Sequence, residues 1–361
     1  MWVSPFKSAE LEVVPPRKEA DARVAVLINA NARKVTPKVV RALSHVVGQG
    51  DLFLSRGELD TRRIAQTVLD RRYQTVFFGG GDGTFMCFAN ELLNQAAVRS
   101  RHHSTPLPRF GVLKLGTGNS VANVVNASKG DGILDDVLRA RAGEVPGYRN
   151  LDLLMVDGRR APFAGLGMDG KLLNDYIWVK QNFGAGPLKP LLTGAGGYIA
   201  SVGLKTVPHY LTQPTVVNCE IINGKARAAY RMGADGTPVG EPVGPGGTIY
   251  KGELMMAAAA TIPYYGFGLK MFPFAMKRKG MMNLRFGSMP ATQILANLKG
   301  LWAGTWLPEG IQDWLCSEAT IRFDRPMPFQ LGGDAEGYRE QLKLTVAPDS
   351  VEMVDFTGSV H

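Results

Sequence analysis

The chain has few cysteines and no long apolar run. Its 361 residues include three cysteines, which are far apart and odd in number: Cys87, Cys219 and Cys316. They show neither the spacing of a zinc site nor a disulfide framework, so a reducing cytoplasm is the simplest setting for them. No stretch approaches the ~18 uninterrupted apolar residues of a membrane span. The N-terminus lacks the apolar core of a signal peptide, and we expect a cytoplasmic protein.

Acidic residues are scarce relative to basic ones. The chain has 41 Lys and Arg against 32 Asp and Glu, which gives a formal net charge of +9 at pH 7. No nucleic-acid-binding module is recognisable, and the basic residues are not interleaved with stacking aromatics, so no nucleic-acid partner is expected. Residues 270–282 mix four cations with Met and Phe side chains. This pattern fits peripheral binding to an anionic membrane, and it fits equally a loop whose apolar residues are core.

The most informative motif is Val-Phe-Phe-Gly-Gly-Gly-Asp-Gly-Thr at residues 76–84. An apolar strand runs into a glycine-rich turn and then into a helical stretch, which is typical of a phosphate cradle. Glycines let the backbone approach a ligand, and the helix start offers N–H groups and a positive dipole end. A carboxylate repels phosphate, so Asp82 indicates either a divalent cation between them or a hydroxyl that it orients. A tight turn without a ligand is the plain alternative. The predicted cradle comprises Gly79, Gly80, Gly81, Asp82, Gly83 and Thr84.

A second strand-turn-helix unit lies downstream. Residues 110–115 read as a buried strand, which runs into a polar turn made of Gly116, Thr117, Gly118 and Asn119. An earlier strand, residues 23–28, stops at Asn29, and Thr36 with Pro37 then indicates a helix start. This alternation predicts a parallel sheet with helices on both faces. Ligands bind beyond the carboxyl ends of such strands, so Asn29 and the two glycine turns are expected at one edge. A P-loop lysine is missing and the Rossmann spacing differs.

The chain changes character near Arg149. Beyond it, short apolar runs are separated by Gly, Pro and Asp clusters, which predicts an antiparallel β-sandwich or barrel. Two longer apolar stretches, residues 171–211 and 291–307, fit either core packing or a mobile cover over an acyl chain. In the second stretch, Trp302 and Trp306 are expected on one face of a helix, which would suit a lipid headgroup boundary.

Together the motifs resemble the catalytic domain of the diacylglycerol kinase and sphingosine kinase superfamily, which is related in fold to NAD kinases. The resemblance rests on the two glycine turns and on three later stretches, at residues 163–170, 263–275 and 331–336. It implies a diacylglycerol kinase-like α/β domain with a parallel sheet, followed by an all-β antiparallel domain with a few helices. The implied boundaries are a loose tail at 1–20, a nucleotide-binding domain at 21–148, a lipid-substrate domain at 149–346, and a return of residues 347–361 to the first domain.

The resemblance also implies a nucleotide site and a catalytic set. ATP would rest its phosphates on residues 79–84, with Mg²⁺ bridging them and with Asp82 as a direct or water-mediated partner of the metal. Asn29, Ser55 and residues 116–119 would complete the nucleotide site. Phosphoryl transfer also needs a group that accepts the proton of the acceptor hydroxyl. By the resemblance, Glu336 is that base and Asp334 its partner.

The chain departs from the family pattern in its late motifs. Residues 332–337 read Gly-Gly-Asp-Ala-Glu-Gly where Asp-Gly-Glu-Pro is usual, which leaves the register of Asp334 and Glu336 open. Lys279 and Gly280 stand where the family has Asp-Gly, with Asn283 nearby. This argues against the structural magnesium site that bacterial relatives carry there.

These inferences predict an ATP-dependent lipid kinase that phosphorylates diacylglycerol. A sphingoid base, ceramide or another hydroxylated lipid is the alternative acceptor. A catalytically silent lipid-binding protein on the same fold and a nucleic-acid binder are the alternatives from other classes. The expected location is the cytoplasm, peripheral at the inner membrane face. The oligomeric state stays open, a homodimer included.

Overall fold

The computed structural model describes residues 23–100, 106–167, 216–266, 268–289, 293 and 296–357. The chain divides into an N-terminal unit, which ends at Leu151 and includes the residues from Ser350 on, and a C-terminal unit, Asp152–Asp349. The apolar stretch at residues 171–211 lies outside the described residues. Within the described ones, no helix has both the length and the hydropathy to cross a membrane.

The N-terminal unit is built on a six-stranded sheet of order β2-β1-β3-β4-β17-β5. Neighbouring strands run parallel except for β5, which is antiparallel to β17. The strands are β1 (Val24–Asn29), β2 (Leu52–Ser55), β3 (Thr75–Gly80), β4 (Arg109–Lys114), β5 (Gly147–Leu151) and β17 (Val351–Asp355). The helices are α1 (Pro37–Val47), α2 (Glu58–Asp70), α3 (Asp82–Ser100), α4 (Ser120–Val124) and α5 (Gly132–Ala142), with a short 3-10 turn at Gln49–Asp51. The predicted α/β architecture is confirmed.

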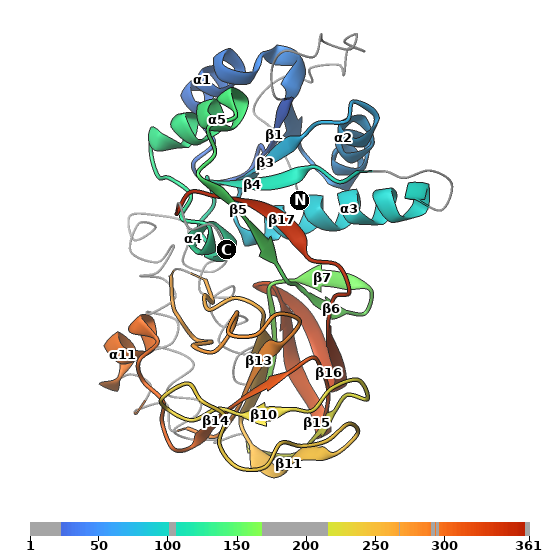
Figure 1. The fold of residues 1–361 in the computed structure, drawn as a ribbon, viewed down its shortest axis with the longest axis vertical. Coiled ribbons are helices and arrows are strands. Elements are labelled where there is room, and N and C mark those ends of the chain that lie inside the picture. Colours follow the sequence, from blue (N-terminus) through green and yellow to red (C-terminus); the bar gives the residue numbers. More distant parts are fainter. Residues whose placement is uncertain are drawn as a thin grey trace. The chain divides into compact units, whose positions relative to one another are not determined.

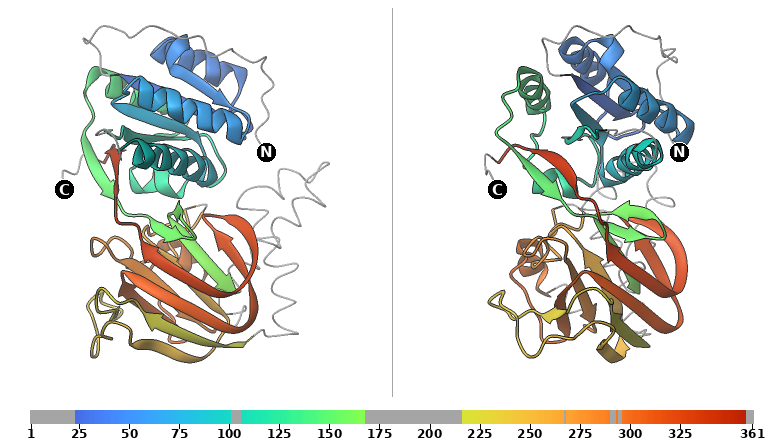
Figure 2. Two further views of the ribbon diagram at one scale, coloured as in Figure 1. Left: turned by 90° about the vertical axis from the view of Figure 1, so that its right-hand side faces the viewer. Right: turned by 45° about the vertical axis from the view of Figure 1, so that its right-hand side comes forward.

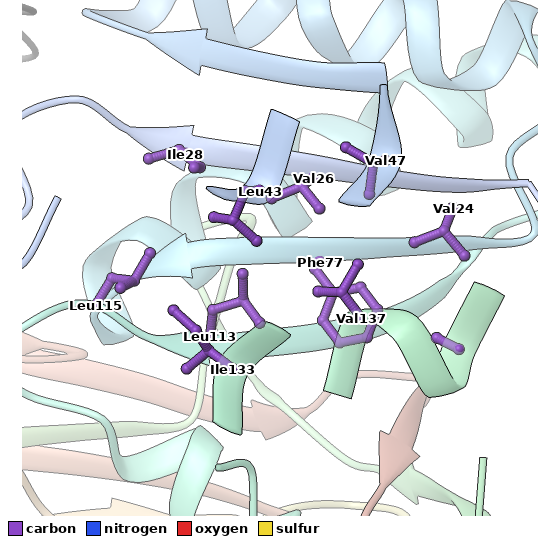
Figure 3. Close-up of a cluster of buried hydrophobic side chains, with 11 residues drawn as sticks. Val24, Val26, Ile28, Leu43, Val47, Phe77, Leu113, Leu115, Ile133 and Val137 are labelled. Atoms are coloured by element: carbon purple, nitrogen blue, oxygen red, sulfur yellow. The ribbon is translucent and has the colours of Figure 1, made fainter. Parts of the chain in front are cut away.

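Side-chain alternation along β3 gives the sheet two packed faces. Phe77 lies in a cluster with residues of α1 and α5 (Figure 3). Phe78 points to the other face, where its ring packs against Phe85 and Phe88 of α3 at centroid distances of 5.7 and 6.0 Å. Each such buried ring contributes about 1.5–3 kcal/mol. Figure 1 shows α1 and α5 together on one side of the strands and α3 on the other. The first cluster consists of Val24, Val26, Ile28, Leu43, Val47, Phe77, Leu113, Leu115, Ile133, Val137 and Ala140.

The last strand of the chain is tied into the first sheet by a buried carboxylate. Asp355 is fully buried and accepts hydrogen bonds from Arg149 Nε at 2.8 Å and from the Thr357 backbone N–H at 2.9 Å. Burial alone would raise the pKa of Asp355, but the bonds from Thr357 and Arg149 outweigh it and hold that pKa below its ordinary value. Charge-assisted hydrogen bonds of this kind favour the ionised form.

The C-terminal unit is an antiparallel sheet, drawn from several directions in Figures 1 and 2. Its main path runs β10-β14-β13-β12-β8-β15-β16-β6-β7, and β9 pairs with both β11 and β15. The prediction of an all-β second domain is confirmed. Its strands are β6 (Leu154–Val156), β7 (Arg159–Ala161), β8 (Phe163–Gly167), β9 (Val217–Asn223), β10 (Tyr230–Arg231), β11 (Thr248–Leu254), β12 (Met256–Ala260), β13 (Met282–Gly287), β14 (Ile311–Cys316), β15 (Glu318–Leu331) and β16 (Asp334–Val346).

The helix expected over residues 291–307 ends earlier than predicted. Helix α11 spans Leu298–Ala303 and is closed by Gly304, whose φ of 73° is left-handed. The backbone N–H of Trp306 then turns back to the carbonyl of Gly300 at 3.3 Å. The prediction that Trp302 and Trp306 share one helical face is therefore wrong, because glycine at this position ends the helix between them.

Candidate nucleotide and acceptor sites

The two glycine turns of the N-terminal unit contact each other through their backbones. Gly116 N–H donates to the carbonyl of Gly80 at 2.9 Å, and Asp82 N–H donates to the carbonyl of Gly118 at 3.2 Å. A Cβ atom on Gly116 would lie 2.3 Å from the nitrogen of Gly81, which is too close for any heavy atom. Glycine is therefore required here by the approach of one turn to the other. Both turns follow the carboxyl ends of paired strands, β3 and β4, as the sequence predicted.

Asp82 links the two turns. One carboxylate oxygen accepts from the backbone N–H of Ser120 at 2.9 Å and the other from that of Val121 at 3.1 Å. Asp82 is the first residue of α3, and its carboxylate also caps the first turn of α4. The capping role depends on a tertiary contact and could not be predicted from the sequence. Asp82 is only 7% exposed. Burial raises the pKa of Asp82, and the bonds from Ser120 and Val121 oppose this rise without cancelling it.

The first strand joins this edge through Asn29. Its side-chain amide donates to the hydroxyl of Thr84 at 3.2 Å, and its carbonyl oxygen accepts from the backbone N–H of Asn31 at 2.8 Å. Thr84 is buried in the first turn of α3. The ends of β1, β3 and β4 therefore meet at one edge of the sheet, where the sequence placed the nucleotide.

Asn119 carries an unpaired polar atom at this edge. Its side-chain nitrogen donates to the carbonyl of Gly116 at 3.0 Å, which fixes the amide. Its side-chain oxygen is buried and has no hydrogen-bond partner among the residues that the structure describes. Leaving a buried acceptor unpaired costs about 1–3 kcal/mol. A ligand that supplies an N–H or O–H donor or a cation would satisfy it, while the neighbouring Thr117 is exposed.

Ser55 ends β2 beside Asn29, at the edge where the sequence predicts the nucleotide. Its hydroxyl is fully buried and bonds internally, to the carbonyl of Gly57 at 3.1 Å and to the hydroxyl of Thr61 at 3.0 Å. In this arrangement the hydroxyl stabilises the turn between β2 and α2. Its predicted contact with a nucleotide would require these bonds to break, and it stays a prediction.

Three lysines beside the second glycine turn were not singled out from the sequence. Lys114 ends β4 and is 7% exposed, and the amine of Lys34 lies 3.5 Å from its carbonyl oxygen. Burial lowers the pKa of Lys114, and the charges of Lys129 and Lys34 lower it further while Asp136 opposes them. Residues 110–115 read as an apolar strand, so nothing local marked Lys114. These cations give the edge a positive potential that suits phosphate.

Among the described residues, no group of three or more His, Cys, Asp or Glu side chains could hold a metal ion without other ligands. Both oxygens of Asp82 accept backbone N–H groups, so a cation at this edge would take most of its ligands from phosphate oxygens and water, as Mg²⁺ commonly does. At the loop with Lys279, the side chain of Asn283 is buried, accepting from Phe274 N–H at 3.1 Å and donating to Asp313 at 2.9 Å. Arg285 is the positive partner of Asp313, at 3.7 Å.

In the C-terminal unit, three sequence motifs meet at one end of the sheet. Phe163 at the start of β8 pairs with Ala260 at the end of β12, and Ala164 pairs with Leu331 at the end of β15. Gly332 N–H donates to the carbonyl of Phe163 at 2.8 Å. The motifs at residues 163–170, 263–275 and 331–336 are thus brought together as far as they are described.

An aromatic series lines this end of the sheet. The ring of Tyr265 lies 4.7 Å from that of Phe163 and 6.0 Å from that of Phe272, measured between centroids. Phe163 and Phe272 are almost fully buried. Tyr265, which is half-buried, brings an apolar ring and one polar hydroxyl to this end, a combination that suits an amphipathic acceptor.

The predicted acids stand at the start of β16, on one side of the strand because they are two residues apart. Glu336 accepts a hydrogen bond from Arg159 of β7 at 2.7 Å. Asp334 is an exposed residue, but reduced hydration and the charge of Glu336 raise its pKa, and Arg159 offsets part of this rise. Arg159 is the functional candidate here that the sequence did not mark, because a basic residue in a short strand carries no local signal. Asp82 and Glu336 belong to different units.

Comparison with known families yields one match, in the N-terminal unit. Residues 23–147, which hold both glycine turns, match the family model of the diacylglycerol kinase catalytic domain. This match confirms the predicted superfamily resemblance for the N-terminal unit. The match supports a lipid kinase at the level of the family. No curated protein sequence matches the chain.

Solved structures share the fold over both units. A candidate diacylglycerol kinase from Bacillus anthracis str. Sterne has 14% identity and a TM-score of 0.64, with 95% of this chain and 100% of that chain covered. A diacylglycerol kinase from the same organism has 12% identity and a TM-score of 0.57, with 94% and 98% covered. At such low identity the likeness concerns the fold alone.

Proposed function

We propose that this chain is an ATP-dependent lipid kinase that transfers the γ-phosphoryl group to the free hydroxyl of diacylglycerol and so makes phosphatidic acid. The observation that carries the proposal is the family match over residues 23–147, which coincides with the edge where β1, β3 and β4 end. Supporting it are the aromatic series and the acid pair at one end of the C-terminal unit.

The nucleotide half of the reaction is assigned to the interlocked turns. The 19-residue helix α3 begins at Asp82, so the positive end of its dipole lies within residues 79–84, where a phosphate would sit. The unpaired oxygen of Asn119 would accept a donor from the nucleotide or from its water. Lys34 and Lys129 would neutralise phosphate charge. Mg²⁺, when bound with the nucleotide, would neutralise the rest of the phosphate charge.

The acceptor half is assigned to Glu336 and its surroundings. Its carboxylate would take the proton of the lipid hydroxyl as the new O–P bond forms and the bond to ADP breaks. Arg159 fixes one oxygen of Glu336 at 2.7 Å and leaves the other for the substrate. The pKa of Asp334 is raised, and its carboxyl would serve as a hydrogen-bonding partner of Glu336. The half-buried ring of Tyr265 would contact the apolar part of the acceptor.

The test presents hydroxylated lipids one at a time to the purified chain with γ-labelled ATP and Mg²⁺. We expect label in phosphatidic acid when diacylglycerol is supplied in mixed micelles. Label in a phosphorylated sphingoid base or ceramide, and none in phosphatidic acid, would reassign the acceptor. If no lipid becomes labelled although the chain binds ATP, the catalytically silent alternative is correct and the proposal fails.

A further inference from the structure

One exposed surface of the C-terminal unit combines positive charge with an apolar tip. Four consecutive residues, Met276, Lys277, Arg278 and Lys279, are all exposed, and we call them the basic loop. Met276 is 37% exposed and has a φ of 65°, in the left-handed region that non-glycine residues seldom adopt. The fold therefore holds an apolar side chain outward at an energetic cost, beside three cations.

The basic loop stands on a rigid base. Before it, the backbone N–H of Phe274 donates to buried Asn283, and the guanidinium of Arg285 bonds the carbonyl of Met271. After it, the N–H of Gly280 donates to the carboxylate of Asp152 at 2.7 Å. Phe274, which comes two residues before the loop, is buried in a cluster with Met232, Met281 and Leu315. The apolar residues of this segment thus divide into a buried set and one exposed methionine.

Neighbouring segments add to the positive charge. The guanidinium of Arg278 lies 4.7 Å from the centroid of the Tyr230 ring, and the side chain of Arg227 reaches Gly280. Among the described residues, no carboxylate forms an ion pair with the three cations of the basic loop. Asp235, on the next hairpin, bonds Thr237 instead. The charge of this surface is therefore available to a partner.

We propose that the basic loop docks the protein on an anionic phospholipid surface, with the cations on headgroup phosphates and Met276 inserted among the upper acyl carbons. A methionine flanked by cations is suited to the boundary between headgroups and hydrocarbon, where apolar insertion and electrostatic attraction add together. The loop carries no aromatic ring of its own on which a base could stack, which makes nucleic acid the poorer partner. The inference rests on the proposed function only in that a membrane is where a lipid acceptor resides.

The test measures binding of the full chain, without nucleotide, to vesicles of phosphatidylcholine alone and to vesicles with about a third phosphatidylglycerol. Wild type is expected on the anionic vesicles and not on the neutral ones. The triple variant Lys277→Ser/Arg278→Ser/Lys279→Ser is expected to bind about 100-fold more weakly, which is about 3 kcal/mol at 1.4 kcal/mol per tenfold step. Met276→Gly should weaken binding several-fold, since glycine accepts the positive φ.

The matched control removes three exposed cations from the N-terminal unit, as Lys38→Ser/Arg41→Ser/Arg63→Ser, and should bind like wild type. Equal loss in both triple variants would overturn the proposal, because net charge alone would then account for binding. Failure of wild type to bind anionic vesicles would overturn it too. So would binding to a DNA duplex that is lost in the basic-loop variant while no vesicle binds. None of these results depends on phosphoryl transfer, so they are separable from the failure of the proposed reaction.

Discussion

Replacing Asp82 tests whether its carboxylate holds the two glycine turns together. Asp82→Ala removes the acceptor for two backbone N–H groups, those of Ser120 and Val121, at residues that are no more than 1% exposed. Each unpaired N–H costs about 1–3 kcal/mol, and the release of a buried carboxylate returns part of this. We therefore expect a net loss of about 2–4 kcal/mol in the N-terminal unit. Asp82→Asn keeps one acceptor oxygen and should lose about half as much.

Hydrogen exchange followed peptide by peptide is the suitable assay, because it reports the turn directly. Residues 116–125 should lose protection in Asp82→Ala and part of it in Asp82→Asn, while the strands of the C-terminal unit keep theirs. If Asp82→Ala abolishes turnover but leaves both exchange and thermal unfolding unchanged, Asp82 acts only on the ligand and the capping account is wrong.

The raised pKa of Asp82 adds a pH dependence to the same comparison. The folded state binds the proton more tightly than the unfolded state, so the contribution of Asp82 to stability is largest below about pH 4 and declines as pH rises through its native pKa. The stability of wild type relative to Asp82→Asn should therefore fall with rising pH and become constant above that window. A difference that grows with pH would contradict the stated balance between burial and hydrogen bonding.

Three further predictions follow from single contacts. Gly116→Ala should destabilise the N-terminal unit by about 2–3 kcal/mol in denaturant unfolding, since the new methyl group meets backbone; Gly57→Ala, which meets nothing within 4 Å, should change stability by less than about 1 kcal/mol. Arg159→Met should lower kcat about tenfold with little change in KM for ATP, and Arg159→Lys should restore part of it; an unchanged kcat would remove Arg159 from any part in positioning Glu336. Asp355→Asn should be about 2 kcal/mol less stable than wild type at neutral pH, because charge-assisted bonds are lost. As pH falls below about 4 toward the lowered native pKa of Asp355, this difference should disappear, and a difference that persists in acid would count against the account.

The sequence predicted what depends on local pattern. Apolar runs that end in glycine placed β3 and β4, and the signal at Thr36 and Pro37 located the start of α1, where the Thr36 hydroxyl accepts from Val39 N–H at 3.3 Å. The alternation of strands and helices then predicted a parallel sheet. A parallel sheet in turn brings Asn29 and the two glycine turns to the same edge.

Roles that depend on contacts distant in sequence could not be read in this way. Asp82 and the helix that it caps are 38 residues apart, and the sequence alone offered only a ligand to explain an acid among glycines. The internal bonds of Ser55 and the contact of Arg159 with Glu336 are likewise products of the fold. The break between Trp302 and Trp306 was different, because Gly304 marks the helix end in the sequence itself.

Transfer of label from γ-labelled ATP to diacylglycerol, measured for wild type and for two variants of β16, tests the central claim most directly. Wild type is expected to form labelled phosphatidic acid. Glu336→Gln should reduce the rate by about 10²–10⁴-fold while ATP still binds, and Glu340→Gln, an exposed carboxylate on the same strand, should match wild type. Equal rates for wild type and Glu336→Gln, or no labelled lipid from any of them, would contradict the account.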